Sequence, residues 1–188
     1  MSHPFLRNYQ PLSLPEGHPP VLTVVIDTEE EFDWHQPFDR KNTSVDAMEH
    51  IGRAQEVFDE FEIRPTYVVD YPVASQKTGY TLLREFVSSG RATIGAHLHP
   101  WVSPPHEEDV SSFNSYPGNL SAQLEEAKLT LLTDQITDTF GARPTIYKAG
   151  RYGLGPNTGE ILSKLISGVP TAVVGIPLTT SAEVAKSQ

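Results

Sequence analysis

Short apolar runs alternate along the chain with longer segments in which apolar residues recur at helical spacing. The runs at 21–26, 66–70, 92–96, 145–149 and 171–176 predict strands. The segments 43–61, 80–89, 121–140 and 157–166 predict helices. Strict alternation of strand and helix is typical of a parallel sheet with crossover helices. The pattern therefore predicts an α/β fold.

The first predicted strand and two of the helices can be described more closely. The run at 21–26 is rich in Val and Ile, as in strands buried on both faces. The first helix begins at Thr43 or Ser44, either of which can cap it. Its apolar positions are Met48, Ile51, Phe58 and Phe61. The longest helix ends at Gly141, and its apolar positions are Leu124, Ala127, Leu131 and Ile136.

Composition narrows the class of protein. A length of 188 residues suits one domain, which we expect over 21–167, with an extended arm at 1–20 and an atypical tail at 168–188. A net charge of −10 without a basic cluster argues against nucleic acids and anionic membranes as partners. No apolar segment is long enough for a signal peptide core or a membrane span, so we expect a cytoplasmic protein. The absence of cysteine excludes disulfides and thiolate chemistry.

Ionisable residues follow four of the predicted strands. They are Asp27, Asp70, His97 with His99, and Lys148 with Arg151. The carboxyl ends of parallel strands share one edge of the sheet, where α/β folds bind ligands. We therefore expect these side chains to form one site.

The histidines of the segment HLHPW suggest a metal site. Alternate residues of an extended chain face the same side, so His97 and His99 can present both imidazoles to one divalent ion. A carboxylate from the segment Asp-Thr-Glu would leave coordination positions for water. The alternative is a hydrogen-bonded pair of surface histidines.

The acidic segment VVIDTEEEFDW begins at the end of a predicted strand. Asp27 and Glu29 are two residues apart and can point to the same side, so we expect both to be functional. Glu30, Glu31 and Asp33 are expected to be solvated or structural. The alternative for all five residues is a solvated loop.

Cations and aromatic residues complete the candidate site. Lys148 or Arg151 can pair with Asp27 and keep it ionised, unless both belong to a surface loop. Asp70 either contacts substrate or ends a turn as a helix cap. Trp34 and Trp101 either stack on a sugar or belong to the core.

Four segments together resemble a known family. LTVVIDTEEEFDW, PTYVVDYPVA, TIGAHLHPW and RPTIYKAGRYG follow the order and spacing of the polysaccharide deacetylases of carbohydrate esterase family 4, over about 21–160. They are most similar to the subgroup whose first motif is Asp-Thr-Glu. The resemblance implies a deformed (β/α) barrel and a divalent metal, usually zinc. It also implies removal of N-acetyl groups from an amino-sugar-containing saccharide, for instance in the bacterial envelope.

The resemblance also implies roles for particular residues. Asp27 would be the catalytic base, Glu29 the metal-binding acid and His97 the first histidine ligand. The family's second histidine usually stands at the position of Trp101, so His99 is its substitute. The family's base-orienting arginine aligns with Lys148, and Arg151 is the alternative. Trp34, Asp70 and Trp101 are the expected substrate contacts.

After residue 160 the sequence departs from the family pattern. No histidine follows His106, although the family has a late histidine that serves as general acid. Five strands cannot close a barrel of seven or eight, so we expect an incomplete barrel, either truncated or an open variant. The leading function is metal-dependent N-deacetylation, impaired in this chain. The alternatives are an inactive sugar- or metal-binding module and a metallohydrolase of small amides, and the oligomeric state stays open.

Overall fold

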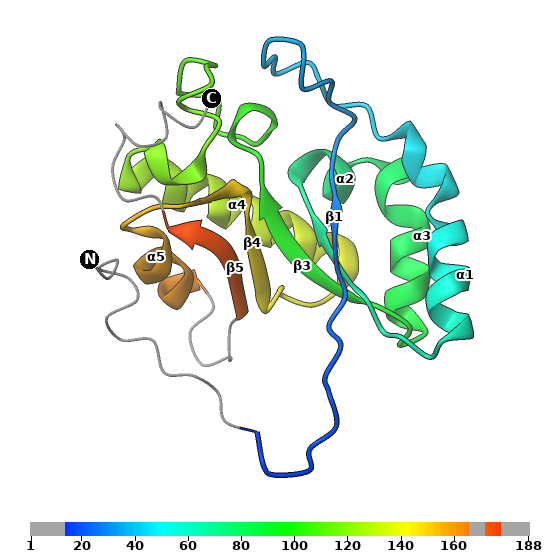
Figure 1. Ribbon diagram of the computed structural model, residues 1–188. Helices are drawn as coiled ribbons and strands as arrows, with labels where there is room; N and C mark the ends of the chain where they lie inside the picture. Colours follow the sequence, from blue (N-terminus) through cyan, green and yellow to red (C-terminus); the bar gives the residue numbers. More distant parts are fainter. Residues whose placement is uncertain (1–13, 166–171, 178–188) are drawn as a thin grey trace.

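Five parallel strands form one sheet, and each strand pairs with its neighbour in the sequence. The computed structural model describes residues 14–165 and 172–177. The strands are β1 (Val25–Thr28), β2 (Thr66–Val69), β3 (Thr93–Leu98), β4 (Ile146–Leu154) and β5 (Ala172–Pro177). A sequential order of parallel strands is that of a barrel wall, and the sheet curls into part of one (Figure 1). The predicted α/β fold with an incomplete deformed barrel is confirmed.

Helices connect the strands. They are the 3₁₀ helix η2 (Asp46–His50), α1 (Gly52–Glu60), α2 (Tyr71–Ser75), α3 (Lys77–Ser88), α4 (Ala122–Phe140) and α5 (Thr158–Leu165), with short 3₁₀ turns η3 (Pro100–Val102) and η4 (Pro117–Asn119). Helix α4 packs on β3 and contacts α2, α3 and α5. In Figure 1 the helices α2 and α4 lie behind the sheet, and α1 and α3 stand to the right of β1. Among the described helices, none has the length and apolarity to cross a bilayer.

Alternate residues of the strands separate the core from the candidate site. The core face of the sheet consists of apolar residues that pack with the helices, namely Ile26, Tyr67, Val69, Ile94, Ala96, Leu98, Tyr147 and Ala149. Successive side chains of a strand point to opposite faces. Asp27, His97 and Lys148 therefore lie on the other face, inside the curl of the sheet. The strand pattern thus places the charged residues together on the concave face.

The first strand differs from its prediction. We expected residues 21–26, buried on both faces, whereas β1 begins at Val25 and Val21 and Leu22 are exposed. Pairing with β2 starts at Val25 and Thr66, so the preceding residues extend past the end of the sheet. Val25 itself is 40% exposed, because β1 is an edge strand of the described sheet. The prediction was wrong on both points.

The first predicted helix is also different. It is divided into η2 and α1, and neither has a side-chain cap. The hydroxyl of Ser44 donates instead to Glu31, 2.8 Å away. Phe61 follows the end of α1 and is exposed. Helix α2 was not predicted. Helix α3, which was predicted to begin at Tyr80, begins at Lys77.

The apolar face predicted for α4 is only partly correct. Of its four positions Ile136 is buried, whereas Leu131 is 41% exposed. The buried face includes the polar residues Glu125 and Lys128. The Lys128 ammonium donates hydrogen bonds to three main-chain carbonyl groups of the loop at 100–105. A polar group with such partners can be buried, and hydropathy alone does not reveal it.

The expected domain limits are only partly covered by the described residues. Residues 1–13 of the expected arm lie outside them. Of the expected tail at 168–188, only β5 is described; it pairs with β4, as the apolar run at 171–176 predicted.

Candidate metal centre

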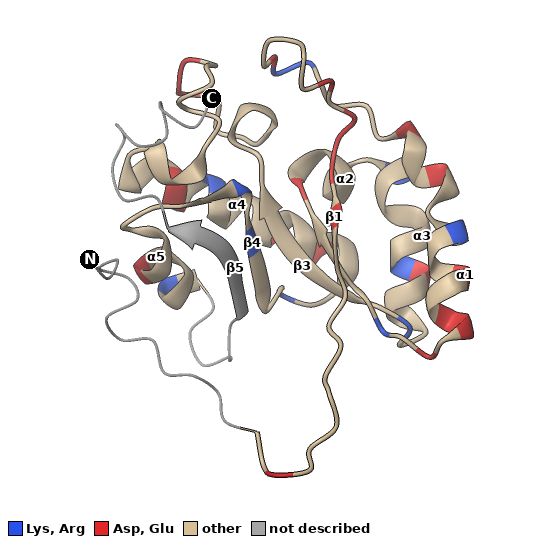
Figure 2. Ribbon diagram, viewed as in Figure 1, with Lys and Arg blue, Asp and Glu red and all other residues tan. Residues whose placement is uncertain are grey.

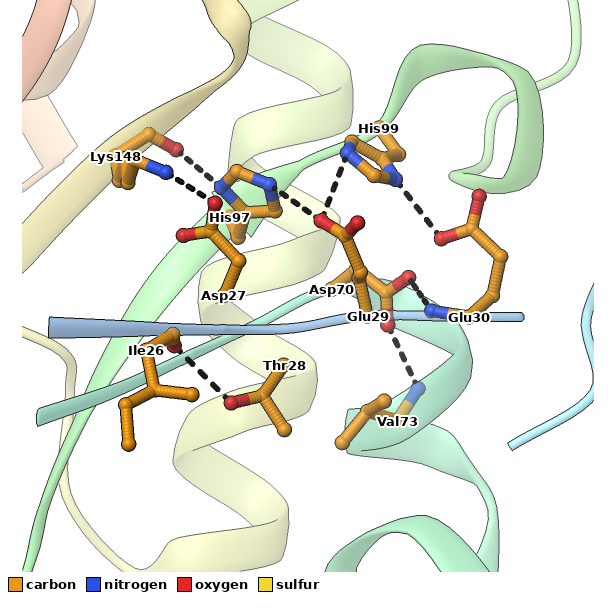
Figure 3. A network of polar contacts seen from close by, with 10 residues as sticks. All are labelled: Ile26, Asp27, Thr28, Glu29, Glu30, Asp70, Val73, His97, His99 and Lys148. Carbon is orange, nitrogen blue, oxygen red and sulfur yellow. Dashed lines mark hydrogen bonds and ion pairs between the residues drawn. The ribbon is translucent and has the colours of Figure 1, made fainter. Parts of the chain in front are cut away.

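Both histidines of β3 and its following loop point toward one carboxylate (Figure 3). The Nε2 atom of His97 lies 3.1 Å from Oε2 of Glu29, and the Nε2 atom of His99 lies 3.4 Å from the same oxygen. The side chains of both histidines are 2% exposed, whereas that of Glu29 is 28% exposed. The structure thus brings together the three residues expected to hold a metal.

The hydrogen bond at Nδ1 of His97 determines which of its nitrogen atoms faces Glu29. His97 Nδ1 lies 2.9 Å from the main-chain carbonyl oxygen of Lys148. A carbonyl oxygen only accepts hydrogen bonds, so Nδ1 carries the proton and a neutral His97 presents the lone pair of Nε2 to Glu29. Two acceptors then face each other at 3.1 Å. This arrangement requires a cation or an extra proton between them.

A second carboxylate orients His99 from the opposite side. The Nδ1 atom of His99 lies 2.8 Å from Oε2 of Glu30, whose side chain is fully buried. The main-chain N–H of Glu30 donates to Oδ2 of Asp70 at 2.9 Å. Glu30 was expected to be solvated or structural; it is structural, and it contacts an imidazole. Carboxylates in this position fix the tautomer of metal-binding histidines.

Asp70 is fully buried and caps α2. Its Oδ1 accepts a hydrogen bond from the main-chain N–H of Val73 at 2.9 Å. Of the two roles expected from the sequence, the structure gives it that of a helix cap. It connects the segment after β1 to the end of β2, and it has no surface with which to contact a saccharide.

Burial and neighbouring charges shift several pKa values in this cluster. Burial raises the pKa of Glu30 to about 7, and burial together with Glu30 raises that of Asp70 well above its usual value. Burial lowers the pKa of His99, so its neutral form is favoured. Burial acts to raise the pKa of Glu29, but the contacts with His97, His99 and Lys148 lower it. A neutral imidazole beside an ionised Glu29 is the state that binds metal.

Asp27 lies beside this triad and forms an ion pair with Lys148. The side chain of Asp27 is 36% exposed and that of Lys148 is 9% exposed. The sequence left Lys148 and Arg151 as alternative partners of Asp27. The structure brings Lys148 to Asp27, whereas the hydrogen bonds of Arg151 are with Ser112 and Ser115.

An open cleft of about 270 Å³ connects these groups to solvent. It is lined by Asp27, Glu29, Trp34, His97, His99, Tyr116, Lys148, Arg151 and Tyr152. Figure 2 shows the acidic residues of this region in the segment that follows β1. Between Lys148 and Gly153 the strand β4 is irregular, and its pairing with β5 shifts register.

The two tryptophans have different positions. Trp34 is 54% exposed and lines the cleft, whereas Trp101 is 2% exposed. The indole of Trp101 stacks on the His99 imidazole at 4.3 Å between ring centroids. Phe32 and Phe38 pack against Trp101 on its other sides. Trp34 is therefore placed to contact a ligand, and Trp101 supports His99.

Two aromatic residues of the cleft, Tyr116 and Tyr152, were not predicted from the sequence. Tyr152 lies beside Arg151 in the segment YKAGRYG, so its position at the end of a strand was a signal that could have identified it. Tyr116 belongs to a loop without regular pattern, and nothing in its local sequence marks it.

The residues present fit a divalent metal ion. Two imidazole nitrogens and a carboxylate oxygen lie within 4.8 Å of one another, and imidazole with carboxylate is a ligand set of catalytic zinc. Three protein ligands leave a position for water or substrate.

Two solved structures have a fold similar to that of this chain. No protein-family model and no curated protein sequence matches the chain. A Mycobacterium smegmatis protein assigned as a polysaccharide deacetylase is similar to 90% of the chain, with a TM-score of 0.57 and 15% identity. The chitin deacetylase of Colletotrichum lindemuthianum is similar to 80% of it, with a TM-score of 0.50 and 12% identity.

The chain spans 62% and 53% of these two structures, respectively. Both similarities extend over most of the chain, and both proteins are deacetylases by name. The resemblance read from the sequence is therefore confirmed for the fold, which is that of the polysaccharide deacetylases.

Proposed function

We propose that this protein is a metal-dependent hydrolase that removes N-acetyl groups from an amino-sugar-containing saccharide. The observation that carries the proposal is the convergence of His97, His99 and Glu29 beside Asp27 in one open cleft. The fold shared with deacetylases supports it.

His97, His99 and Glu29 would hold the metal through Nε2, Nε2 and a carboxylate oxygen. A bound divalent ion supplies Lewis acidity, which lowers the pKa of water and polarises an amide carbonyl. Zinc suits this set of ligands best. Glu30 and the carbonyl of Lys148 hold the two imidazoles in the orientation that exposes Nε2.

Asp27 is the general base in this proposal. It lies on the same face of the sheet as His97 and is partly exposed to the cleft, so it can take a proton from the attacking water. The ammonium of Lys148 pairs with this carboxylate and restrains its position. Lys148, rather than Arg151, is therefore the base-orienting residue.

The cleft limits the size of the group that reacts. Its volume of about 270 Å³ is smaller than the roughly 300–1,000 Å³ of pockets that enclose drug-sized ligands. One sugar ring with its acetamido group is a suitable occupant. Trp34 offers an exposed ring at the edge of the cleft, on which the apolar face of a sugar can stack.

The proposed chemistry also needs a general acid. Asp27, once it has taken a proton from water, can return it to the leaving amine. A separate, positioned general acid contributes about 10²–10⁴ in rate. With Asp27 in both roles, we expect slow release of acetate.

Acetate release from an N-acetylglucosamine oligomer tests the proposal, with zinc-loaded protein and with the Asp27→Asn variant. We expect slow release by the first and none by the second, at equal metal content. Metal binding without any acetate release by the wild-type chain would instead support a binding module. Acetate release by Asp27→Asn at the wild-type rate would contradict the assignment of Asp27 as the general base.

A further inference from the structure

Arg151 is the cation of the cleft that the proposed chemistry does not use. Lys148 pairs with Asp27, and Glu29 faces the imidazoles. Among the described residues, no carboxylate forms an ion pair with Arg151, although its guanidinium is half-buried and lines the cleft.

The Arg151 guanidinium lies among aromatic rings, 5.3 Å from the ring centroid of Phe38 and 5.7 Å from that of Trp34, and its hydrogen bonds within the described residues involve one nitrogen. Its Nη1 atom donates to Oγ of Ser115 at 2.5 Å and to the carbonyl oxygen of Ser112 at 3.4 Å. Its central carbon lies 4.0 Å from the centroid of the Tyr116 ring. An arginine has five N–H donors, and within the described part of the chain hydrogen bonds of this side chain involve Nη1 alone. The remaining donors can bind a planar oxyanion.

The backbone at this position is strained. Arg151 and Tyr152 have positive φ angles of 52° and 57°, a conformation that non-glycine residues rarely adopt. Both side chains line the cleft. Strain of this kind persists where the surrounding structure enforces it, and it is concentrated at ligand-binding sites.

The carboxylates of the cleft leave Arg151 available to a ligand. Asp27 forms its ion pair with Lys148, and Glu29 faces the imidazoles of His97 and His99. Among the described residues neither carboxylate therefore offsets the charge of Arg151. A negatively charged substituent of a ligand would offset it.

We infer that the saccharide carries an oxyanion, a carboxylate or a phosphate group, which binds the guanidinium of Arg151. This inference rests on the proposed function for the identity of the saccharide. The anion site itself is defined by Arg151, Ser115 and Tyr116 and does not depend on hydrolysis.

Calorimetric titration of the chelator-treated protein tests the site without a contribution from metal. The probes are glucuronate, inorganic phosphate and neutral glucose. The variants are Arg151→Gln, Ser115→Ala and the control Arg91→Gln, whose guanidinium pairs with Asp59 and Glu85 in another cleft. We expect Arg151→Gln to weaken binding of at least one anion by about tenfold or more, since hydrogen bonds to charged groups contribute about 1.5–3 kcal/mol. Arg91→Gln should bind like the wild type.

Two results would overturn the inference: equal anion affinity in wild type and Arg151→Gln, or glucose bound as tightly as glucuronate. If Arg151→Gln does not fold, the Ser115→Ala variant tests the inference instead. It removes the hydroxyl that accepts from Nη1, and it should weaken binding of the same anion several-fold. Whichever anion binds more tightly identifies the substituent. Arg151-dependent anion binding without acetate release from any substrate contradicts the proposed function only. Equal kcat/KM for neutral and anionic acetylated sugars contradicts the anion site only.

Discussion

The Nδ1 atom of His97 lies 2.9 Å from the main-chain carbonyl oxygen of Lys148, on the neighbouring strand. This hydrogen bond turns Nε2 toward Glu29, and the same residue, Lys148, pairs with Asp27 through its side chain. Lys148 therefore orients His97 through its main chain and contacts Asp27, the proposed base, through its side chain.

Replacement of His97 should abolish stoichiometric metal binding. In His97→Ala only His99 and Glu29 remain of the three ligands, and two protein ligands bind zinc weakly. Elemental analysis after dialysis should give about one metal ion per wild-type chain and almost none in the variant. The control His106→Ala changes a histidine outside the triad and should keep the metal. Full occupancy in His97→Ala would contradict the assignment.

Glu30 should affect metal affinity without binding the metal. Glu30→Gln weakens the acceptor at His99 Nδ1, and loss of such partners typically costs about 10–100-fold in metal affinity. Competition with a chromophoric chelator measures this change. Glu31→Gln is the matched control, because the adjacent Glu31 bonds to Ser44 and the Ala47 N–H rather than to a histidine. Equal affinities of the two variants would contradict the orienting role of Glu30.

The sequence predicted the fold and which residues form the candidate metal group, namely Glu29, His97 and His99. The strands β2 and β3 are short runs whose side chains are almost all buried, and the histidine pair stands at the end of β3. The choice between Lys148 and Arg151 could not be made from sequence. It depends on the path of β4 after Gly150, where two positive φ angles turn Arg151 toward Ser115.

The polar interior was harder to predict. Glu30 is next to Glu29 in an acidic run, and only tertiary packing distinguishes the buried carboxylate from the solvated one. The buried face of α4 contains Glu125 and Lys128, since their partners lie on loops and on α5, distant in sequence. Hydropathy patterns do not contain this information.

Gly150 should be required for the contact between β4 and the histidine loop. A Cβ atom at this position would lie 2.1 Å from the carbonyl oxygen of Leu98 and 2.7 Å from Cδ2 of His99. Gly150→Ala should lower the free energy of unfolding by about 1–3 kcal/mol, as overpacking does, and weaken metal binding. Denaturant unfolding measures the first effect. In the control, Gly159→Ala, the new Cβ meets no atom within 4 Å, and stability should be unchanged or slightly higher. Equal stabilities would contradict the close approach.

Lys148 should influence hydrolysis through Asp27. Lys148→Met removes the ammonium and retains most of the side-chain volume, while its main-chain carbonyl still accepts from His97. We expect nearly unchanged metal content, a lower kcat and an altered pH dependence of acetate release. Arg151→Met is the comparison, since Arg151 does not pair with Asp27. A pH profile identical to that of the wild type would contradict the orienting role of Lys148.

Glu125 should make the stability of the fold depend on pH. Its side chain is buried on α4, one oxygen accepts a hydrogen bond from Thr158, and the other has no hydrogen-bond partner among the described residues. Burial raises the pKa of Glu125 to about 7, from a usual value of 4.5. Between these two pH values the folded state binds more protons than the unfolded state. The free energy of unfolding therefore falls as pH rises, and the full destabilisation by the buried carboxylate is present above pH 7.

Glu125→Gln is neutral at every pH and retains an acceptor for Thr158. The variant should therefore gain stability relative to the wild type from about pH 4.5 to 8, by about 1–3 kcal/mol. Urea unfolding at several pH values measures this difference, and Glu126→Gln, at the less buried neighbouring position, should show none. If the free energy of unfolding changed with pH in the same way for Glu125→Gln and the wild type, burial of Glu125 would not be the cause of a pH-dependent stability.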